Sequence, residues 1–203
     1  MESLESLLKE LKDIAISSSS YNEIDENRLR DICSKLEKKT RYGTRCYIKK
    51  QFIKDLANVE INDNHISSFA NIVKSYIYLT KDLGIKKEEI GEIIKEFPQI
   101  LELNIEKKIE PKLNFYENKG YSRDYIIKRY RLFSYSLEKR IKPRFAFLDY
   151  LGIKESNLVK ILYPNDKDFS KKYFKDGKKD YLEFLKKYKP YKNYKKRKNR
   201  ERD

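Results

Sequence analysis

The chain repeats one stretch of its own sequence. IEKKIEPKLNF, residues 105–115, returns as LEKRIKPRFAF, residues 137–147, after an offset of 32 positions. Each copy carries a proline, Pro111 or Pro143, and each proline lies nine residues before a glycine. A repeat of this period is typical of solenoids built from small units, each of which buries its apolar face only against a neighbour. The repetition therefore predicts a stacked array.

Shorter motifs extend the repeat on both sides. Leu83-Gly84-Ile85 matches Leu151-Gly152-Ile153, with Lys119-Gly120-Tyr121 between them, and Phe97-Pro98 matches Tyr163-Pro164, with Arg129-Tyr130 at the corresponding place in the middle unit. Each unit is thus predicted to be a helix, a short tight turn and a second helix.

Proline and glycine place the ends of these helices. Pro98 drives the preceding residue out of the helical region, so the helix from about Glu88 should end at Phe97. The prolines at 111 and 143 should lie near helix starts, where their missing N–H costs little. The three glycines at 84, 120 and 152 are expected to adopt the left-handed conformation of a helix C-terminus.

Further helices are predicted before the repeats. Apolar residues at three- and four-residue steps place them at residues 4–11, 24–36, 47–57 and 66–79, with a loop at 17–20 and capping side chains at Asn62-Asp63-Asn64. We interpret these helices as packing elements. With Gly (6) and Pro (5) scarce, few residues remain for the turns of a many-stranded sheet, so the expected class is all-α.

At this point the sequence resembles a known family. Leu83-Gly84, Glu89-Ile90, Phe97-Pro98-Gln99-Ile100-Leu101, residues 131–144 (RLFSYSLEKRIKPR) and Asp168–Phe174 (DFSKKYF) look like mitochondrial transcription termination factor (mTERF) repeats over about residues 70–175. The resemblance implies a right- or left-handed solenoid of helix pairs with short 3₁₀ turns. We expect N-terminal helices at 1–65, repeats at 66–176 and a basic tail at 177–203.

The resemblance also implies a function. It predicts a nucleic-acid-binding protein of mitochondria, or alternatively plastids, that uses a basic concave side and carries no catalytic residues or cofactor. The short array and basic tail favour structured RNA, within or beside the ribosome, and therefore ribosomal or other organellar proteins as partners. Two alternatives stay open: duplex DNA binding in transcription termination or regulation, and a protein–protein interaction module.

Charge is strongly asymmetric along the chain. Residues 1–100 carry 17 Lys/Arg and 17 Asp/Glu, whereas residues 101–203 carry 30 and 15, so the net charge of +15 lies entirely in the second half. Such asymmetry indicates a polyanionic partner, with nucleic acid before an anionic membrane surface.

The candidate binding residues come from two segments. In the repeats they are Lys107, Lys108, Lys112, Lys139, Arg140, Lys142 and Arg144, which stacking is expected to set in parallel rows. In the tail they are Lys186, Lys187, Lys189, Lys192, Lys195, Lys196, Arg197, Lys198 and Arg200, with Tyr188, Tyr191 and Tyr194 available to stack on bases. The alternatives are a solvated face paired with neighbouring glutamates and a solubilising or localisation tail.

Enzyme and metal signatures are missing from the sequence. It contains no phosphate-binding glycine loop and no H-E-x-x-H motif. The lone histidine, His65, is interpreted as a surface or capping residue, and with Cys33 and Cys46 it is too little for a tetrahedral zinc site. Both thiols are expected to be reduced packing residues. No apolar run is long enough to span a membrane, and the start, Met1-Glu2-Ser3-Leu4-Glu5, does not resemble a secretory signal.

Overall fold

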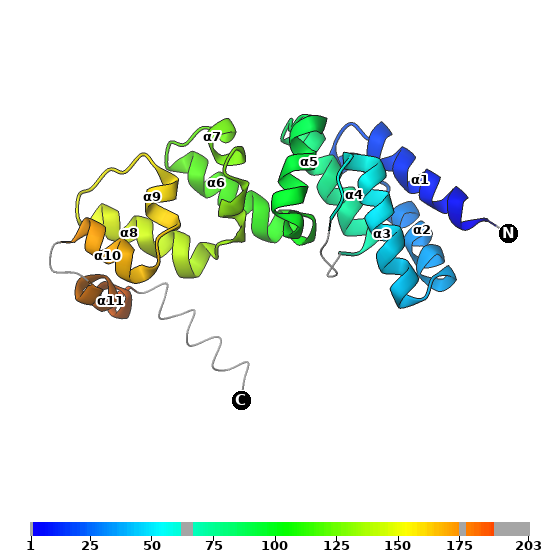
Figure 1. The fold of residues 1–203 in the computed structure, drawn as a ribbon. Helices are drawn as coiled ribbons and strands as arrows, with labels where there is room; N and C mark the ends of the chain where they lie inside the picture. Colours follow the sequence, from blue (N-terminus) through cyan, green and yellow to red (C-terminus); the bar gives the residue numbers. More distant parts are fainter. Residues whose placement is uncertain (1, 62–66, 175–177, 189–203) are drawn as a thin grey trace. The chain divides into compact units, whose positions relative to one another are not determined.

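The computed structural model describes residues 2–61, 67–174 and 178–188, and in those ranges it contains helices and no strands (Figure 1). The all-α prediction is confirmed. The chain divides into two compact units, Met1–Glu110 and Pro111–Asp203. The boundaries predicted from sequence, after residues 65 and 176, follow changes of sequence pattern rather than of packing, and they stay predictions.

Within its described residues, the first unit contains five α-helices, several of which begin with a side-chain cap. They are α1 (Leu4–Ser17), α2 (Glu26–Lys39), α3 (Tyr42–Ala57), α4 (Phe69–Ile77) and α5 (Lys87–Glu96), with a 3₁₀ turn, η1, at Tyr21–Glu23 and another, η3, at Pro98–Glu102. The side chains of Ser3, Asp25 and Ser68 accept hydrogen bonds from first-turn N–H groups of α1, α2 and α4.

Two features of these helices differ from the sequence prediction. Helix α3 begins at Tyr42, five residues before the predicted start, because the turn after α2 is only two residues long. Helix α4 is capped by Ser68, whereas the predicted capping residues 62–64 and His65 lie outside the described residues. Sequence periodicity misplaced the start of α3 because its first turn, Tyr42-Gly43-Thr44, presents no buried apolar residue.

The N-terminal region is fastened to the first repeat by hydrogen bonds. Ser20 Oγ donates to Asp82 Oδ1 at 2.6 Å, and the Tyr21 backbone N–H donates to Asp82 Oδ2 at 2.8 Å. The Tyr21 hydroxyl donates to the Glu106 carboxylate, and its ring packs edge-on against Tyr78. Burial and the Glu106 contact raise the pKa of Tyr21 above its ordinary value. The first unit is therefore one packed body.

The second unit continues the repeats and closes with a capping helix. Its helices are α6 (Glu110–Asn118), α7 (Arg123–Ile127), α8 (Lys142–Tyr150), α9 (Leu158–Leu162), α10 (Asp166–Tyr173) and α11 (Lys178–Lys187), with a 3₁₀ turn, η5, at Tyr130–Ser134. Tyr181 and Leu185 of α11 are buried, and the Tyr181 ring packs on Phe147 and Phe169. Leu182 of the same helix is 37% exposed.

The two repeated prolines follow widened helical turns. A π-helical turn, η4 (Ile105–Ile109), precedes Pro111, and another, η6 (Leu137–Ile141), precedes Pro143. In an α-helical turn the proline ring would clash with the carbonyl four residues earlier, and the wider turn relieves that clash. Pro111 and Pro143 are the second residues of α6 (Glu110–Asn118) and α8 (Lys142–Tyr150), as predicted, and each helical segment begins one π-helical turn earlier.

The remaining sequence expectations about helix ends are confirmed. Helix α5 ends at Glu96 with Phe97 as its C-cap, and the 3₁₀ turn starts at Pro98. Gly84, Gly120 and Gly152 have φ values of 70°, 88° and 68°. These left-handed residues reverse the chain between the two helices of each repeat.

Replacing Gly91 with alanine is expected to destabilise the first unit by about 1–3 kcal/mol through overpacking. A Cβ at this position of α5 would lie 2.8 Å from the carbonyl oxygen of Ala57, at the end of α3. The free energy of unfolding, followed by circular dichroism in urea, measures the effect. Gly43→Ala is the matched control, because a Cβ there meets nothing within 4 Å. Equal stability of the two variants would contradict the close α3–α5 contact.

Candidate nucleic-acid interface

The net positive charge is confined to one of the two units. Residues 1–110 carry 19 Lys/Arg and 20 Asp/Glu, whereas residues 111–203 carry 28 and 12. The second unit is therefore the strongly basic part of the molecule, and it creates a positive potential that attracts polyanions.

Two of the predicted binding residues are buried side chains that hold the repeats together. Lys112 is 5% exposed and donates its ammonium to the carbonyl oxygen of Phe133. Arg144, 32 positions later, is fully buried and donates to the carbonyl oxygens of Ile161 at 2.7 Å and Leu162 at 3.3 Å. Lys112 thus connects α6 to the 3₁₀ turn η5, and Arg144 connects α8 to the end of α9. We remove both from the proposed binding surface.

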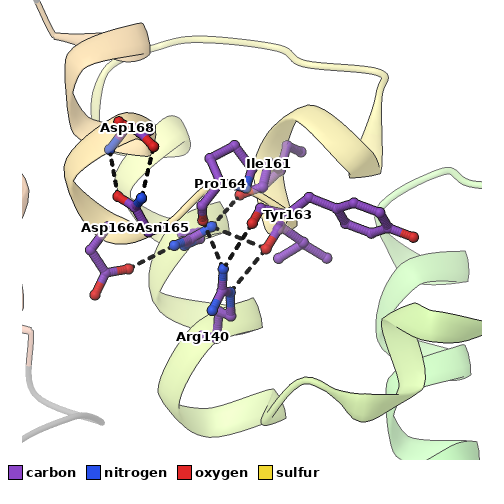
Figure 2. A network of polar contacts seen from close by, with 9 residues as sticks. Arg140, Ile161, Tyr163, Pro164, Asn165, Asp166 and Asp168 are labelled. Carbon is purple, nitrogen blue, oxygen red and sulfur yellow. Dashed lines mark hydrogen bonds and ion pairs between the residues drawn. The ribbon is translucent and has the colours of Figure 1, made fainter.

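Arg140 is also occupied by backbone contacts. Its guanidinium donates to the carbonyl oxygens of Leu162 at 2.9 Å, Tyr163 at 3.3 Å and Pro164 at 2.7 Å (Figure 2). Burial, and then the neighbouring charge of Arg144, lower its pKa below the ordinary value. Carbonyls at the end of a helix attract cations. The guanidinium of Arg140 therefore mainly binds the carbonyl oxygens at and after the end of α9.

The other predicted residues of the repeats lie at the surface. Lys107 and Lys108 are exposed in the first unit, and Lys139 is exposed in the second. Lys142 is partly exposed and pairs with Glu138 one turn earlier. The parallel rows expected from the sequence therefore do not include the buried Lys112 and Arg144. The alignment of the exposed cations in rows stays a prediction.

The tail is described only in part. Lys186 and Lys187 are exposed in the last turn of α11, and Tyr188 stacks on Phe184 with ring centroids 5.5 Å apart. The remaining candidates lie outside the described residues: Lys189, Tyr191, Lys192, Tyr194, Lys195, Lys196, Arg197, Lys198 and Arg200.

The structure gathers arginines and tyrosines where the repeats' second helices and 3₁₀ turns end. The Tyr135 and Tyr163 rings meet edge to face at 6.1 Å, and Arg140 lies over the Tyr135 ring at 4.5 Å. The positive charges of Arg131 and Arg129 act on the Tyr163 hydroxyl, although burial and Tyr135 raise its pKa overall. We call Arg129, Arg131, Tyr135 and Tyr163 the arginine–tyrosine surface.

Part of this surface is open to solvent, although Arg129 is half-buried, donates to the carbonyl oxygen of Tyr125 at 3.0 Å and lies over the Tyr125 ring at 3.6 Å. Tyr163 is 41% exposed, Arg131 is exposed, and the ring of Tyr163 points away from Arg140 (Figure 2). Guanidinium groups contact phosphate and stack on bases, and tyrosine rings stack on unpaired bases. The sequence carries one signal for this surface, since Arg129 and Tyr163 occupy in their repeats the position that Phe97 occupies in the first.

Comparison with known proteins gives the family. The mTERF family profile matches residues 46–170, more than half of the chain. The chain belongs to the mTERF family. The resemblance inferred from residues 70–175 is confirmed, and the matched segment begins earlier, within α3. No curated protein and no solved structure gives a significant match.

Membership explains the repeated helices and indicates the general function. mTERF proteins are helical-repeat proteins that bind nucleic acid in mitochondria or plastids, and they are generally not enzymes. Within residues 2–61, 67–174 and 178–188, no group of three or more His, Cys, Asp or Glu side chains could hold a metal ion. In the same ranges, no helix has the length and apolar character needed to cross a membrane.

Proposed function

We propose that this mTERF protein binds structured RNA with its second unit, as a component of or a factor bound to an organellar ribosome. The observation that carries the proposal is the arginine–tyrosine surface in a unit with 28 Lys/Arg and 12 Asp/Glu. Phosphate contacts from the cations position the unit, while the exposed ring is available to a base.

RNA is favoured over duplex DNA by the exposed aromatic residue. Bases within a DNA duplex are stacked on one another, so a tyrosine finds no face to stack on without opening the helix. Loops and bulges of folded RNA offer such faces. Tyr163, at 41% exposure beside two arginines, fits an unpaired base flanked by phosphates.

The proposal also names the ribosome as the partner and the mitochondrion as the location. Only about three repeats can be recognised in the sequence, and a short array suits local contact with a folded RNA better than wrapping of a duplex. The lysine-rich sequence after α11 resembles segments that lie along phosphate in ribonucleoproteins. We place the protein in mitochondria, with plastids as the alternative.

Sedimentation of organelle lysate through a density gradient tests the proposal. The chain is expected to migrate with a ribosomal subunit and to be released by ribonuclease. Migration with nucleoids and release by deoxyribonuclease would indicate the DNA-binding alternative. A position in the gradient that neither nuclease changes would indicate the protein-interaction alternative.

The Tyr163→Leu substitution tests the binding surface. Binding to an RNA hairpin with an unpaired loop is expected to weaken by about 1–3 kcal/mol, because one stacking face is lost. Binding to fully paired RNA should change much less. Fluorescence anisotropy with the two RNAs measures both values. Tyr150→Leu is the matched control, since Tyr150 is 74% exposed in the same unit but outside the arginine–tyrosine surface. Equal losses for both variants would reject the assigned role.

A further inference from the structure

A second basic surface lies in the first unit, at the corner between α2 and α3. Residues 38–50, KKTRYGTRCYIKK, carry six Lys/Arg and no Asp/Glu. The rest of the unit, within residues 1–110, carries 13 Lys/Arg and 20 Asp/Glu. The corner is therefore a local concentration of positive charge on an otherwise acidic unit. Residues 38–45 also precede the segment that the family profile matches.

The corner is held in a fixed shape by one buried threonine and one arginine. Thr40 is 8% exposed and donates its hydroxyl to the carbonyl oxygen of Leu36 at 2.8 Å. The Arg45 guanidinium donates to the carbonyl oxygens of Glu37 at 2.7 Å and Thr40 at 2.9 Å. These hydrogen bonds join the end of α2 to the first turns of α3 and hold the turn between the two helices in place. The neighbouring cations therefore project from a well-ordered turn.

Several other side chains of the corner face solvent. Lys38, Lys39 and Arg41 are exposed, and no acidic partner is found for them among the described residues. Tyr42 is 80% exposed and Tyr47 is 63% exposed. Both rings are therefore accessible to a ligand.

The cations of the corner lie close enough to influence one another, and the carboxylate of Glu37 also acts on Lys49. The pKa of Lys49 is lowered from its ordinary value by burial and then by the positive charge of Arg45. Helix α3 has no acidic residue in its first turn and no side-chain cap at its start. A polyanion would therefore meet the exposed cations Lys38, Lys39 and Arg41 at the start of this helix.

We propose that the α2–α3 corner is a second nucleic-acid site, which takes a single-stranded segment by phosphate contacts to Lys38, Lys39 and Arg41 and by base stacking on Tyr42 and Tyr47. Tyr47 follows Tyr42 by five residues in α3, an axial rise of about 7.5 Å at 1.5 Å per residue, and the two side chains leave the helix about 140° apart around its axis. A strand that contacts both rings therefore bends around the start of α3. Alternating cations and aromatic rings are typical of surfaces that bind single strands without sequence readout.

An anionic membrane is the competing partner, and the composition disfavours it. Membrane-surface helices bury an apolar face of Leu, Phe or Trp in the lipid. Here the exposed aromatic residues are tyrosines, and Ile48, the aliphatic residue of the segment, is 8% exposed and faces the core. The corner therefore offers stacking faces and charge, but no aliphatic surface to insert.

Two variants of the full chain test the site with short fluorescent oligouridylate and oligothymidylate. The Tyr42→Leu/Tyr47→Leu variant is expected to bind on the order of tenfold more weakly or worse, because two stacking faces are lost. The Lys38→Gln/Lys39→Gln/Arg41→Gln variant is expected to lower the slope of log affinity against log salt by about 2, at about 0.7 per phosphate contact on a single strand. Comparison of the two oligonucleotides shows whether the ribose 2′-hydroxyl contributes.

The control removes the same charge elsewhere in the first unit. Lys86→Gln/Lys87→Gln/Lys95→Gln replaces three exposed lysines at and within α5 and should leave the salt slope within about 0.5 of the parent if those side chains contact no phosphate. On irradiation, an oligonucleotide containing 4-thiouridine should crosslink to peptides that contain Tyr42 or Tyr47. Unchanged affinity in the tyrosine variant, or crosslinks that map elsewhere, would overturn the proposal.

The experiment also separates this site from the others. If the corner variants lose binding to phosphatidylserine vesicles but keep oligonucleotide binding, the corner is a membrane surface and the proposal fails. The inference is independent of the arginine–tyrosine surface, because Tyr163→Leu changes the second unit alone. Loss of hairpin binding in that variant, with single-strand binding kept, would support both sites. Retained hairpin binding there would leave the corner assignment standing.

Discussion

Raising the salt concentration from 50 to 200 mM is expected to weaken nucleic-acid binding by a factor of about 10³ to 10⁵, which corresponds to about six to ten phosphate contacts. The net charge of +15 and its concentration in the second unit are the reason, because each contact releases condensed counterions. Fluorescence anisotropy over this range measures the effect. An affinity that hardly changes with salt would show that the cations do not contact phosphate.

Single substitutions distinguish exposed from buried cations in this measurement. Lys139→Gln removes an exposed charge and is expected to lower the salt slope by about 0.7 to 0.9. Lys112→Gln removes a buried ammonium bonded to the Phe133 carbonyl, so it should cost stability and leave the slope unchanged. A lower slope for Lys112→Gln in the folded protein would mean that this lysine reaches the ligand.

Replacing Arg144 with methionine is expected to destabilise the second unit by about 3 kcal/mol, since removal of a buried hydrogen-bonded cation strands its acceptors. The carbonyl oxygens of Ile161 and Leu162 would lose their donor, and the 2.7 Å ion pair with Asp166 would be broken. The Asp166 side chain is 53% exposed, so water takes over part of its solvation. Urea unfolding followed by circular dichroism measures the loss.

A second arginine of the same unit provides the control. Arg123 pairs with Glu117 at 2.8 Å, with side chains 48% and 30% exposed, so Arg123→Met should cost less than about 1 kcal/mol. Equal losses for the two variants would contradict the proposal that the hydrogen bonds of Arg144 hold α8 to the end of α9. Because the chain has two units, the unfolding curve is first tested for separate transitions before a single free energy is assigned.

Local chemistry made most of the fold predictable. The prolines at 98, 111 and 143 and the glycines at 84, 120 and 152 restrict their own backbone angles, so their positions mark turns and helix ends in any context. The widened turns before Pro111 and Pro143 were not predicted, because π-helical and α-helical turns present nearly the same apolar spacing. The early start of α3 was missed for a similar reason, since Tyr42 and Gly43 give no burial signal.

The candidate site was less predictable than the fold. Arg140 and Arg144 look like surface cations in the sequence, within a run of alternating charge. In the folded unit both lie against the end of α9, about 20 residues further along the chain. The exposure of Tyr163 was not predictable either, because Tyr163 and Phe97 are both helix C-caps at equivalent places in the repeats, and only the fold shows that Tyr163 is 41% exposed beside Tyr135.

The sequence by itself determined the all-helical repeats, the family and the basic character of the second half, because these depend on short-range backbone restrictions, a recurring motif and composition. Tertiary structure decided which cations meet solvent. A lysine or arginine is buried where otherwise unpaired carbonyls at a helix or turn end accept hydrogen bonds from it. That pairing joins residues about 20 positions apart, so it follows from packing and is invisible in local sequence.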